Sequence, residues 1–535
     1  MREMIGETRF DLIDRLIAEQ QYLSAVERFA QKHEQTNLPL QAKYYRDLIP
    51  LTKPGKGQQY SFEVDLDRCT GCKACVSACH SLNGLEENET WRDVGLIVGE
   101  LEGQAYQQNV TTACHHCLDP GCLEGCPVMA YQKESETGIV RHLDDQCIGC
   151  QYCTMKCPYD VPKYSERLGI VRKCDLCHDR LVAGEAPACV QACPHEAIRI
   201  RIVDQEEISR QATANARMLP GAFDSSYTKP ATRFVSKKAI PPNAEAANAH
   251  ALTLQPAHWP LLVMLVLTQA AVGSYTALTG IELFNIELVP RIKLPIAAFG
   301  FGLLNLGLAA AVLHLGRPLG AWRFFLGLRT SWMSREILAF GLCAGLSFLA
   351  TVVAWLVPAS PGGPPLMAAA SLTGLVAIFT SAMIYVDTRR QFWHPQLVLG
   401  KFYGTMLLLG TAGTATFGAW LGANSLDRTM GIAALVVQAA LFFWEMSGYH
   451  RDLRNRNCPN YQSAMTVARL LPWFVPVRIS LFLLAALLLL ANCFDYLGQS
   501  AAWASVAFVA LLASQFIERF VFFTAVVPLR MPGGI

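Results

Sequence analysis

Sixteen of the nineteen cysteines in this 535-residue chain lie between Cys69 and Cys193, in four groups of four. The spacings are C-x2-C-x2-C-x3-C, C-x2-C-x4-C-x3-C-P, C-x2-C-x2-C-x3-C-P and C-x2-C-x11-C-x3-C-P. In chain order the groups are Cys69, Cys72, Cys75 and Cys79; Cys114, Cys117, Cys122 and Cys126; Cys147, Cys150, Cys153 and Cys157; Cys174, Cys177, Cys189 and Cys193. Thiols repeated at such short intervals predict a region that folds around the groups they bind.

The third spacing is that of bacterial ferredoxins, in which three thiolates hold one cubane cluster and the fourth binds a neighbouring cluster. Four groups supply the ligands of four 4Fe-4S clusters, so this region is interpreted as a path for electrons. Disulfides are not expected, because residues 1–10 are charged rather than apolar and do not read as a secretory signal.

Two other bound groups are alternatives to iron–sulfur clusters. Zinc accepts paired C-x2-C units, although the repeated third cysteine and the trailing proline are not part of a zinc pattern. Cys174, Cys177 and His178 also fit the C-x-x-C-H pattern of covalent haem attachment, but they lie inside the cysteine series. The three remaining cysteines are predicted to be ordinary thiols in apolar surroundings: Cys343, Cys458 and Cys493.

The second half of the chain contains eight apolar stretches long enough to cross a bilayer as helices. The approximate spans are 260–280, 295–315, 336–357, 367–386, 402–422, 430–446, 474–492 and 501–524. The sixth is interrupted by Gln438 and Glu445. Eight such segments in succession favour a membrane domain over a large soluble helical core. The net charge of +2 gives no support for a nucleic-acid partner.

The basic residues between these spans predict an orientation. With an even number of spans, the cysteine region and the C-terminal residues share one side. That side carries Arg317, Arg323, Arg329, Arg335, Arg389, Arg390, Lys401, Arg451, Arg454, Arg456, Arg469 and Arg530. The other side carries Arg291, Lys293 and Arg428. The positive-inside rule therefore places the cysteine region in the cytoplasm, at the cell inner membrane.

Four regions are expected along the chain. They are an N-terminal helical arm (1–60), a four-cluster ferredoxin-like domain (61–205), a linker (206–259) and an eight-helix membrane anchor (260–525). The arm has apolar residues at helical spacing: Leu12, Ile13, Leu16, Ile17, Leu23, Val26 and Phe29. Such a helix either packs on its own domain or grips a partner subunit, and both interpretations stay open.

Several motifs resemble those of one known family. They are Cys114-His-His-Cys117, Cys147-Ile-Gly-Cys150-Gln-Tyr-Cys153, Cys189-Val-Gln-Ala-Cys193-Pro194, His314-Leu-Gly-Arg-Pro-Leu and Ser331-Trp-Met-Ser-Arg335-Glu336-Ile. The chain resembles a fusion of the four-cluster iron–sulfur subunit and the eight-helix anchor subunit of the dimethyl sulfoxide reductase class, over about residues 65–525. The resemblance implies an α+β domain of two pseudo-repeated two-cluster ferredoxin folds, followed by an all-α membrane domain.

The resemblance also implies how the cysteines are shared among the clusters. The implied sets are Cys69, Cys72, Cys75 and Cys193; Cys174, Cys177, Cys189 and Cys79; Cys114, Cys117, Cys122 and Cys157; Cys147, Cys150, Cys153 and Cys126. Some members of the family replace one cysteine with tryptophan and hold a three-iron cluster. No such replacement occurs here, so four cubanes are expected.

A membrane domain joined to an electron path predicts a lipid-soluble redox partner, and a quinone is the natural candidate. Quinone chemistry moves two electrons and two protons, so a titratable group is expected near the cysteine side of the membrane. The resemblance assigns this role to His314, whose type of side chain titrates near neutrality; an interfacial histidine bonded to backbone is the alternative. Arg335 and Glu336 are second candidates and Glu518 and Arg519 are third, each pair having a structural ion pair as its alternative.

The chain is therefore expected to be a quinone-reactive electron-transfer subunit, with substrate chemistry on a separate subunit. No Walker loop or dinucleotide fingerprint occurs, and the resemblance implies a molybdopterin catalytic subunit. The complex would oxidise sulfite, or reduce a sulfoxide, N-oxide, nitrate or sulfur compound. A stand-alone quinone-linked ferredoxin oxidoreductase and a member of an ion-translocating assembly are the alternatives. The sparse intramembrane acids argue against ion translocation.

Overall fold

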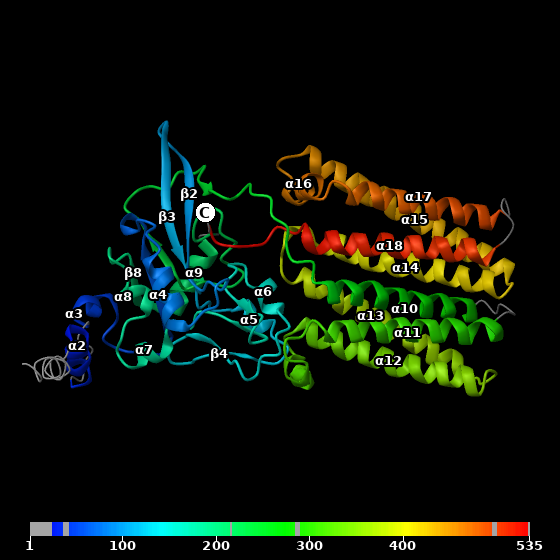
Figure 1. The fold of residues 1–535 in the computed structure, drawn as a ribbon, viewed down its shortest axis with the longest axis horizontal. Coiled ribbons are helices and arrows are strands. Elements are labelled where there is room, and N and C mark those ends of the chain that lie inside the picture. The colour runs from blue at the N-terminus through cyan, green and yellow to red at the C-terminus, as the bar shows by residue number, and fades with distance from the viewer. Residues whose placement is uncertain (1–23, 36–41, 215–216, 284–288, 495–499, 533–535) are drawn as a thin grey trace, which may run out of the picture.

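The computed structural model describes residues 24–35, 42–214, 217–283, 289–494 and 500–532. Figure 1 shows two parts set end to end: a cysteine-rich domain of short strands and helices (residues 42–246), and a helical bundle (Trp259–Thr524). After the last helix the chain runs back to the cysteine-rich domain, where Met531 is buried in the hydrophobic core. The two parts are thus connected twice, by the segment before Trp259 and by the segment after Thr524.

Small antiparallel sheets form the frame of the cysteine-rich domain. The strands are β1 (Gln58–Asp65), β2 (Asp93–Leu101), β3 (Gln104–Thr112), β4 (Tyr131–Lys133), β5 (Val140–His142), β6 (Lys163–Ser165), β7 (Ile170–Arg172) and β8 (Ile198–Asp204). β1 pairs with β8 in the register Gln58↔Asp204, which brings the first and fourth cysteine groups together. The hairpins β4–β5 and β6–β7 flank the second and third groups. This is the ferredoxin-like arrangement expected from the sequence.

Short helices fill the spaces between these strands. They are α3 (Ala42–Tyr45), η1 (Arg46–Leu48), η2 (Leu66–Arg68), α4 (Ala74–Asn83), α5 (Gly121–Glu124), α6 (Tyr152–Lys156), α7 (His178–Val182) and α8 (Ala188–Gln191). Five of them, α4 to α8, begin inside a cysteine group, so the ligand spacing itself limits their length. The domain is consequently held together by its loops as much as by regular structure.

The segment predicted to be a linker, 206–259, is largely part of the cysteine-rich domain. It contains most of α9 (Gln205–Ala214), together with β9 (Arg233–Val235) and β10 (Glu245–Ala246). β9 pairs in parallel with β1, and β10 pairs with β2. The two strands are too short to show a period in a sequence rich in Ala, Pro and Asn, but each satisfies the backbone groups of an otherwise open sheet edge.

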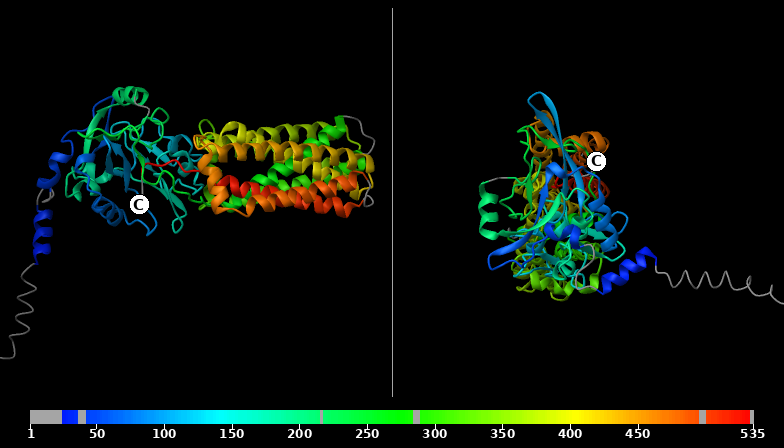
Figure 2. Two further views of the ribbon diagram at one scale, coloured as in Figure 1. Left: turned by 90° about the horizontal axis from the view of Figure 1, so that it is seen from above. Right: turned by 90° about the vertical axis from the view of Figure 1, so that its left-hand side faces the viewer.

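Residues 1–23 and 36–41 of the predicted N-terminal arm (1–60) lie outside the described part of the chain. The described helix α2 (Ala25–Glu34) projects away from the cysteine-rich domain in both views of Figure 2. Its Val26 side chain is 76% exposed. In contrast, α3 and η1 pack onto the domain through the buried side chains of Tyr45 and Leu48.

Over the residues described, the bundle consists of eight long helices and three short ones. The long helices are α10 (Trp259–Leu283), α11 (Val289–Val312), α12 (Trp332–Leu356), α13 (Gly363–Val386), α14 (Pro395–Trp420), α15 (Asn424–Arg454), α17 (Phe474–Cys493) and α18 (Ala501–Thr524). The short ones are η3 (Pro318–Gly327), η4 (Gln391–Trp393) and α16 (Tyr461–Leu470). The long helices correspond in order to the eight predicted spans.

Within the described ranges, seven of these helices are long and apolar enough to cross a membrane, and α14 is not one of them. α14 packs between α10, α15 and α18, where its polar groups are satisfied by partners inside the protein. Thr405 and Thr414 donate to backbone carbonyls one turn earlier in the same helix. A side chain at Gly273 of α10 would come within 2.1 Å of the α14 backbone, so the two helices cross at van der Waals contact.

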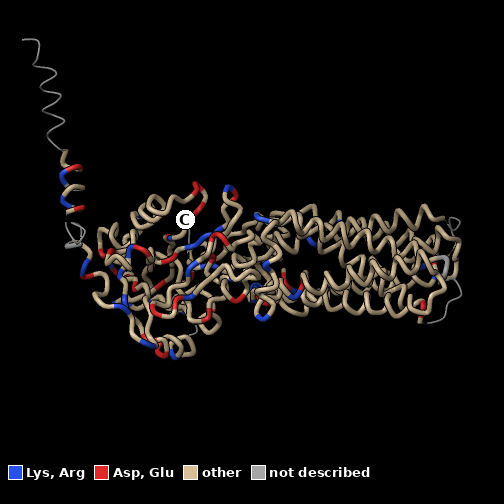
Figure 3. Tube along the Cα trace, turned by 90° about the horizontal axis from the view of Figure 1, so that it is seen from below, with Lys and Arg blue, Asp and Glu red and all other residues tan. Residues whose placement is uncertain are grey.

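Polar pairs explain the two interruptions of the sixth predicted span. Gln438 Nε2 donates to the carbonyl of Phe482 at 2.6 Å, and Glu445 pairs with Arg478 at 2.6 Å. Both partners belong to α17, so α15 stays helical over 31 residues. Figure 3 shows that charged residues are sparse along the bundle and frequent in the cysteine-rich domain and at the bundle end that faces it.

Candidate functional site

The cysteine loops are built on residues with left-handed backbone conformations. Gly71 and Gly149, inside the first and third groups, have φ of 75° and 69°. Lys73 and Gln151 then adopt φ of 62° and 58° and begin the helices α4 and α6. The glycines turn the chain between the first and second cysteines of each group, and Lys73 and Gln151 turn it between the second and third, which keeps the three thiols of a group close together.

Thiols from different groups meet in four sets. Cysteines that interact electrostatically with one another group as Cys69, Cys72, Cys75 and Cys193; Cys79, Cys174, Cys177 and Cys189; Cys114, Cys117, Cys122 and Cys157; Cys126, Cys147, Cys150 and Cys153. All sixteen are free of disulfide bonds. These are the sets that the family resemblance implies.

The sets follow one another in a line. Cys114 interacts electrostatically with Cys174 of another set, and Cys75 interacts with Cys189. At the end of the line nearest the bundle, Tyr131 lies between thiols of two sets and interacts electrostatically with Cys122 and Cys153. Figure 1 places α5 and α6 beside the bundle, and α4 and α8 at the far side of the domain.

The surroundings of the thiols suit iron–sulfur clusters. One cavity is lined by Cys114, Cys117, Cys122 and Cys157, and another by Cys79, Cys174, Cys177 and Cys189. Backbone amides of Ala130 and Ala197 donate to the sulfurs of Cys126 and Cys193, both at 3.2 Å. Such donors stabilise thiolate ligands and tune the potential of a cluster.

Zinc and haem fit less well. Four thiolates around one zinc ion lie about 2.3 Å from it, but among the described residues no three His, Cys, Asp or Glu side chains converge closely enough to hold one metal ion. The haem-like motif is used differently, because His178 Nε2 forms an ion pair with Glu134 at 2.9 Å. Cys177 also interacts electrostatically with Cys189 of its own set.

Two buried cations beside the thiols were not foreseen from the sequence. Lys173 Nζ lies 3.6 Å from the Cys114 sulfur and 2.7 Å from the carbonyl of Cys174. Arg92 interacts electrostatically with Cys79 and Cys189 and stacks on Phe62 at 4.5 Å. Both compensate the negative charge that thiolates carry. Lys173 had a sequence signal, its position directly before a cysteine, whereas Arg92 had none.

The turn after α11 lies directly against the third cysteine group. A side chain on Gly316 would come within 2.1 Å of the carbonyl oxygen of Gly169, and one on Gly149 would come within 3.0 Å of Gly316. The amide of Arg317 donates to the carbonyl of Ile148 at 3.0 Å. The His314-Leu315-Gly316 sequence therefore touches the loop that carries Cys147 and Cys150.

A second contact holds the loop of Cys126. The amide of Gly327, at the end of η3, donates to the carbonyl of Pro127 at 3.0 Å. Ser331 Oγ donates to the carbonyl of Gly125 at 2.8 Å. The loops around the Cys126, Cys147, Cys150 and Cys153 set thus make close contacts between the cysteine-rich domain and the bundle.

An ion pair between a buried lysine and a partly exposed aspartate holds α6 against the end of α13. Lys156 Nζ lies 2.6 Å from Asp387 Oδ2, and the side chain of Lys156 is 2% exposed. Tyr152 donates its hydroxyl to the carbonyl of Ile384 at 3.2 Å. Because the Lys156 ammonium is shielded from water, this contact holds the cysteine loops at a fixed distance from the bundle.

His314 lies in the turn that follows α11, outside the membrane-spanning helix. The side chain is buried, and its Nε2 atom has no hydrogen-bond partner among the described residues. Its ring stands edge-on to His258 at 5.2 Å. Burial and the neighbouring His258 lower the pKa of His314 to about 4, so the ring is neutral at pH 7. Sequence reasoning missed His258, which has the left-handed φ of 47°.

The structure separates the two residues of the second candidate pair. Glu336 is buried in the bundle and interacts electrostatically with Tyr152 and Tyr385. Arg335 points instead to the loop before α12 and donates to the carbonyls of Leu328 at 3.1 Å and Arg329 at 2.6 Å. Glu336 is therefore placed near the cysteine loops, whereas the guanidinium of Arg335 is hydrogen-bonded to backbone carbonyls.

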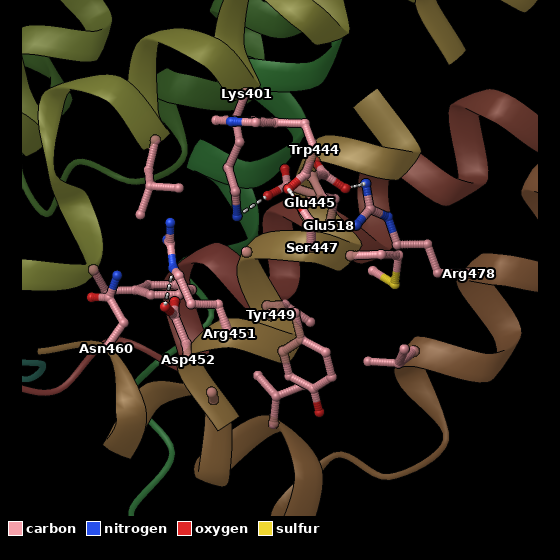
Figure 4. Close-up of a pocket in the computed structure, with 18 of the residues that line it drawn as sticks. Lys401, Trp444, Glu445, Ser447, Tyr449, Arg451, Asp452, Asn460, Arg478 and Glu518 are labelled. Atoms are coloured by element: carbon pink, nitrogen blue, oxygen red, sulfur yellow. Dashed lines mark hydrogen bonds and ion pairs between the residues drawn. The ribbon is translucent and has the colours of Figure 1, made fainter. Parts of the chain in front are cut away.

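The third candidate pair belongs to a different place in the bundle. Glu518 pairs with Lys401 at 2.7 Å and with the adjacent Arg519. Arg519 Nη2 also donates to Gln269 at 2.8 Å. Lys401 and Glu518 of this network line a pocket between α14, α15, α16, α17 and α18, which Figure 4 shows.

Replacing Gly316 with alanine tests the contact between the turn and the cysteine loop. Gly316→Ala is expected to displace the turn, because the added carbon would lie 2.1 Å from the carbonyl oxygen of Gly169. We expect turnover with a quinol, the partner expected from the sequence, to fall at least about tenfold while the iron content stays unchanged. Gly345→Ala in α12, with open space around the new carbon, is the matched control. Equal activity of the two variants would contradict the contact's importance.

Comparisons with known proteins agree with these two parts. The model described as "DMSO reductase anchor subunit (DmsC)" matches residues 255–525, "4Fe-4S dicluster domain" matches 106–202 and "4Fe-4S binding domain" matches 60–81. These matches confirm iron–sulfur clusters and a multi-pass membrane anchor in one polypeptide.

Curated relatives match the cysteine-rich domain. The B subunit of the anaerobic dimethyl sulfoxide reductase of Escherichia coli (strain K12) is 38% identical over 180 residues, covering 32% of this chain and 86% of that protein. The thiosulfate reductase electron transfer subunit PhsB of Salmonella typhi is 38% identical over 155 residues, covering 28% and 80%. This protein belongs to the dimethyl sulfoxide reductase family, as a fusion of its iron–sulfur electron-transfer subunit and its membrane anchor subunit.

Proposed function

We propose that this chain carries electrons between a molybdopterin-containing catalytic subunit and the membrane quinone pool, through four 4Fe-4S clusters. The observation that carries the proposal is the contact of the His314-Leu315-Gly316 turn with the loop of Cys147 and Cys150. This contact places the buried His314 side chain close to the set of thiols that lies nearest the bundle. The relatives whose names specify reductases support electron flow from quinol to the catalytic subunit.

The proposed clusters use all sixteen grouped cysteines. Beginning at the bundle, the four ligand sets are Cys126, Cys147, Cys150 and Cys153; Cys114, Cys117, Cys122 and Cys157; Cys79, Cys174, Cys177 and Cys189; Cys69, Cys72, Cys75 and Cys193. When bound, each cluster accepts and releases one electron. The chain contributes the ligands, the amides that donate to sulfur and the buried Lys173 and Arg92, which lower the cost of holding negative charge in the interior.

The proposed quinone site consists of His314 and Glu336, with His258 behind His314. Oxidation of a quinol releases two electrons and two protons, so the protein must accept protons while the electrons leave toward the thiol line. Neutral His314 accepts a proton at Nε2, the atom that has no partner among the described residues. Glu336 supplies a second acceptor from the bundle interior. Arg335 holds the preceding loop in place.

The cluster content and the quinol reaction test this proposal together. Protein prepared without oxygen is expected to contain about sixteen iron atoms and as many sulfides per chain, because each cubane holds four of each. Adding a reduced naphthoquinol should bleach the visible absorbance of the clusters. An iron content clearly below sixteen would reject four cubanes, and unbleached clusters with the full iron content would reject the quinol reaction.

We further propose that the protein lies in the cell inner membrane with the cysteine-rich domain in the cytoplasm. The connections that the sequence assigns to the side of this domain carry twelve basic residues, and those assigned to the other side carry three. In intact spheroplasts, a protease added outside should leave the cysteine-rich domain uncut. It should cut the domain in inverted vesicles. Cleavage in spheroplasts would place the domain on the other side.

A further inference from the structure

A pocket of about 170 Å³ opens at the end of the bundle that faces the cysteine-rich domain. It lies between α14, α15, α16, α17 and α18, and Figure 4 shows Lys401 and Glu518, and Arg478 and Glu445, directed toward one another. Its walls are apolar and aromatic, with Phe392, Trp444 and Phe474 among the lining residues. The Trp444 ring is fixed against α14, because a side chain on Gly400 would come within 2.5 Å of it.

Charged side chains with little exposure to solvent line the pocket. Lys401 pairs with Glu518 at 2.7 Å, and Arg478 pairs with Glu445 at 2.6 Å. The Glu518 side chain is 2% exposed. Charges inside a bilayer-spanning bundle are costly and, where they occur, mark a functional site. None of these four residues has a described hydrogen bond or ion pair with the turn of His314, so the proposed quinone site does not explain them.

The charge balance of the pocket identifies the kind of ligand. The charged lining residues are three cations, Lys401, Arg451 and Arg478, and three carboxylates, Glu445, Asp452 and Glu518. Each cation already has a carboxylate partner. A phosphate or an acidic lipid headgroup would therefore meet no unpaired positive charge. An uncharged ring that offers carbonyl or hydroxyl groups fits, because it hydrogen-bonds to the paired groups without adding charge.

The pocket lies where such a ring would enter from the bilayer. Trp444 is 38% exposed and Trp473 is 77% exposed at this end of the bundle, as expected for side chains at a membrane–water interface. Below them the exposed faces of α15 and α17 are apolar, with Val436 and Leu483 among the exposed side chains. An isoprenoid tail can lie along these faces while the ring occupies the pocket.

A layer of aromatic rings separates the pocket from His314. The Lys401 ammonium lies 5.9 Å from the Phe522 ring, which stands 5.1 Å from Tyr385. Tyr385 lies 5.6 Å from Phe523, and Phe523 lies 5.8 Å from His258. The pocket is thus separate from the proposed quinone site at His314, and the rings of Phe522, Tyr385 and Phe523 connect the two by packing.

We propose that this pocket is a second binding site for the headgroup of a membrane quinone or quinol, distinct from the site at His314. The inference rests on the proposed quinone reactivity of the chain. Trp444 and Phe474 hold the ring. The Lys401 ammonium donates a hydrogen bond to a ring oxygen, and the Glu518 carboxylate accepts one from a hydroxyl of the quinol form. The pocket binds the carrier beside the reacting site and involves no electron transfer of its own.

Photolabelling of the full-length chain in its purified complex tests the second site. The probe is a short-tailed naphthoquinone that carries an azido group, added to protein freed of endogenous quinone. We expect two equivalents to bind per chain, one labelling residues near 314–336 and one labelling residues near 444–478. His314→Ala should keep the label at 444–478. Trp444→Leu should weaken binding there about tenfold, and Trp503→Leu, equally exposed at the other end of the bundle, should leave it unchanged.

The outcomes separate this inference from the proposed function. Label confined to 314–336 would overturn the second site and leave the proposed function intact. Label in neither place would overturn both. Phospholipid retained at one molecule per chain and lost in Trp444→Leu, without label at 444–478, would assign the pocket to a lipid and overturn the quinone inference.

Discussion

His314→Ala is expected to reduce quinol-linked turnover by about 100- to 10,000-fold, the range typical of losing a positioned proton acceptor. The side chain is buried, its Nε2 has no partner among the described residues, and its turn touches the loop of Cys147 and Cys150. Removing the ring takes away the acceptor without altering a thiol. The measurement is steady-state quinol oxidation by the purified complex, with the iron content determined on the same sample.

His250→Ala is the matched control, because that histidine is exposed and lies outside the bundle. Cluster reduction by dithionite should be normal in both variants. His314→Ala protein that turns over quinol at the normal rate would exclude His314 from the reaction. A low rate accompanied by lost iron would mean that the substitution damaged the clusters, so the iron content decides between the two explanations.

The pH profile gives a second readout for His314. Its pKa is about 4, lowered by burial and by the neighbouring His258, whereas an exposed histidine has a pKa near 6.5. The neutral, accepting form therefore persists down to about pH 5 and is lost as the pH approaches 4. Turnover should be level between pH 5 and 8 and fall below that range. An inflection near pH 6.5 that is absent from His314→Gln would contradict a buried neutral ring.

Cys150→Ser is expected to abolish electron transfer from quinol to the other clusters. The thiol is buried in the set closest to the bundle, where it interacts with Cys126 and Cys147. Serine is a poor ligand for iron, so the cluster at this position should be lost or altered, with up to about four iron atoms missing per chain. The remaining clusters should still be reduced by dithionite. The measurements are iron analysis, quinol turnover and low-temperature electron paramagnetic resonance.

Cys458→Ser provides the control for this substitution. Cys458 lies between α15 and α16, and its sulfur is 3.1 Å from Asp452, a contact that a serine hydroxyl can also make. It should change neither iron content nor turnover. Normal quinol turnover in Cys150→Ser would remove this set from the electron path, and the line of clusters would have to enter the bundle elsewhere.

The cysteine region and the membrane spans were predictable because their signals are local. Each group of four cysteines lies within a short stretch of sequence, and a span of about 20 apolar residues must become a helix in lipid. Hydropathy was a weaker guide for α14 and α15, since Lys401 and Glu445 are satisfied by Glu518 and Arg478 from other helices. Such pairing depends on residues more than thirty positions away, so no window of sequence could show it.

Short pairing elements were missed for a related reason. β9 and β10 have three and two residues, and what makes them strands is the open edges of β1 and β2 rather than their own composition. The sequence alone therefore described 206–259 as a linker. Glycines show a similar limit. Gly316 belongs to the His314-Leu-Gly motif, but the sequence does not show that it approaches Gly169 so closely that neither residue can carry a side chain.

The residue order by itself determined the chemistry of this protein: which thiols can hold iron, which segments must lie in lipid, and which family the chain resembles. Only the tertiary structure decided what meets at the boundary between the two parts. It set His314 beside His258, turned Arg335 away from Glu336 and gathered Lys401, Glu445, Arg478 and Glu518 around one pocket. Ligand type and hydropathy belong to single residues and short runs, whereas contact between distant segments arises from packing that minimises buried unpaired charge and empty space.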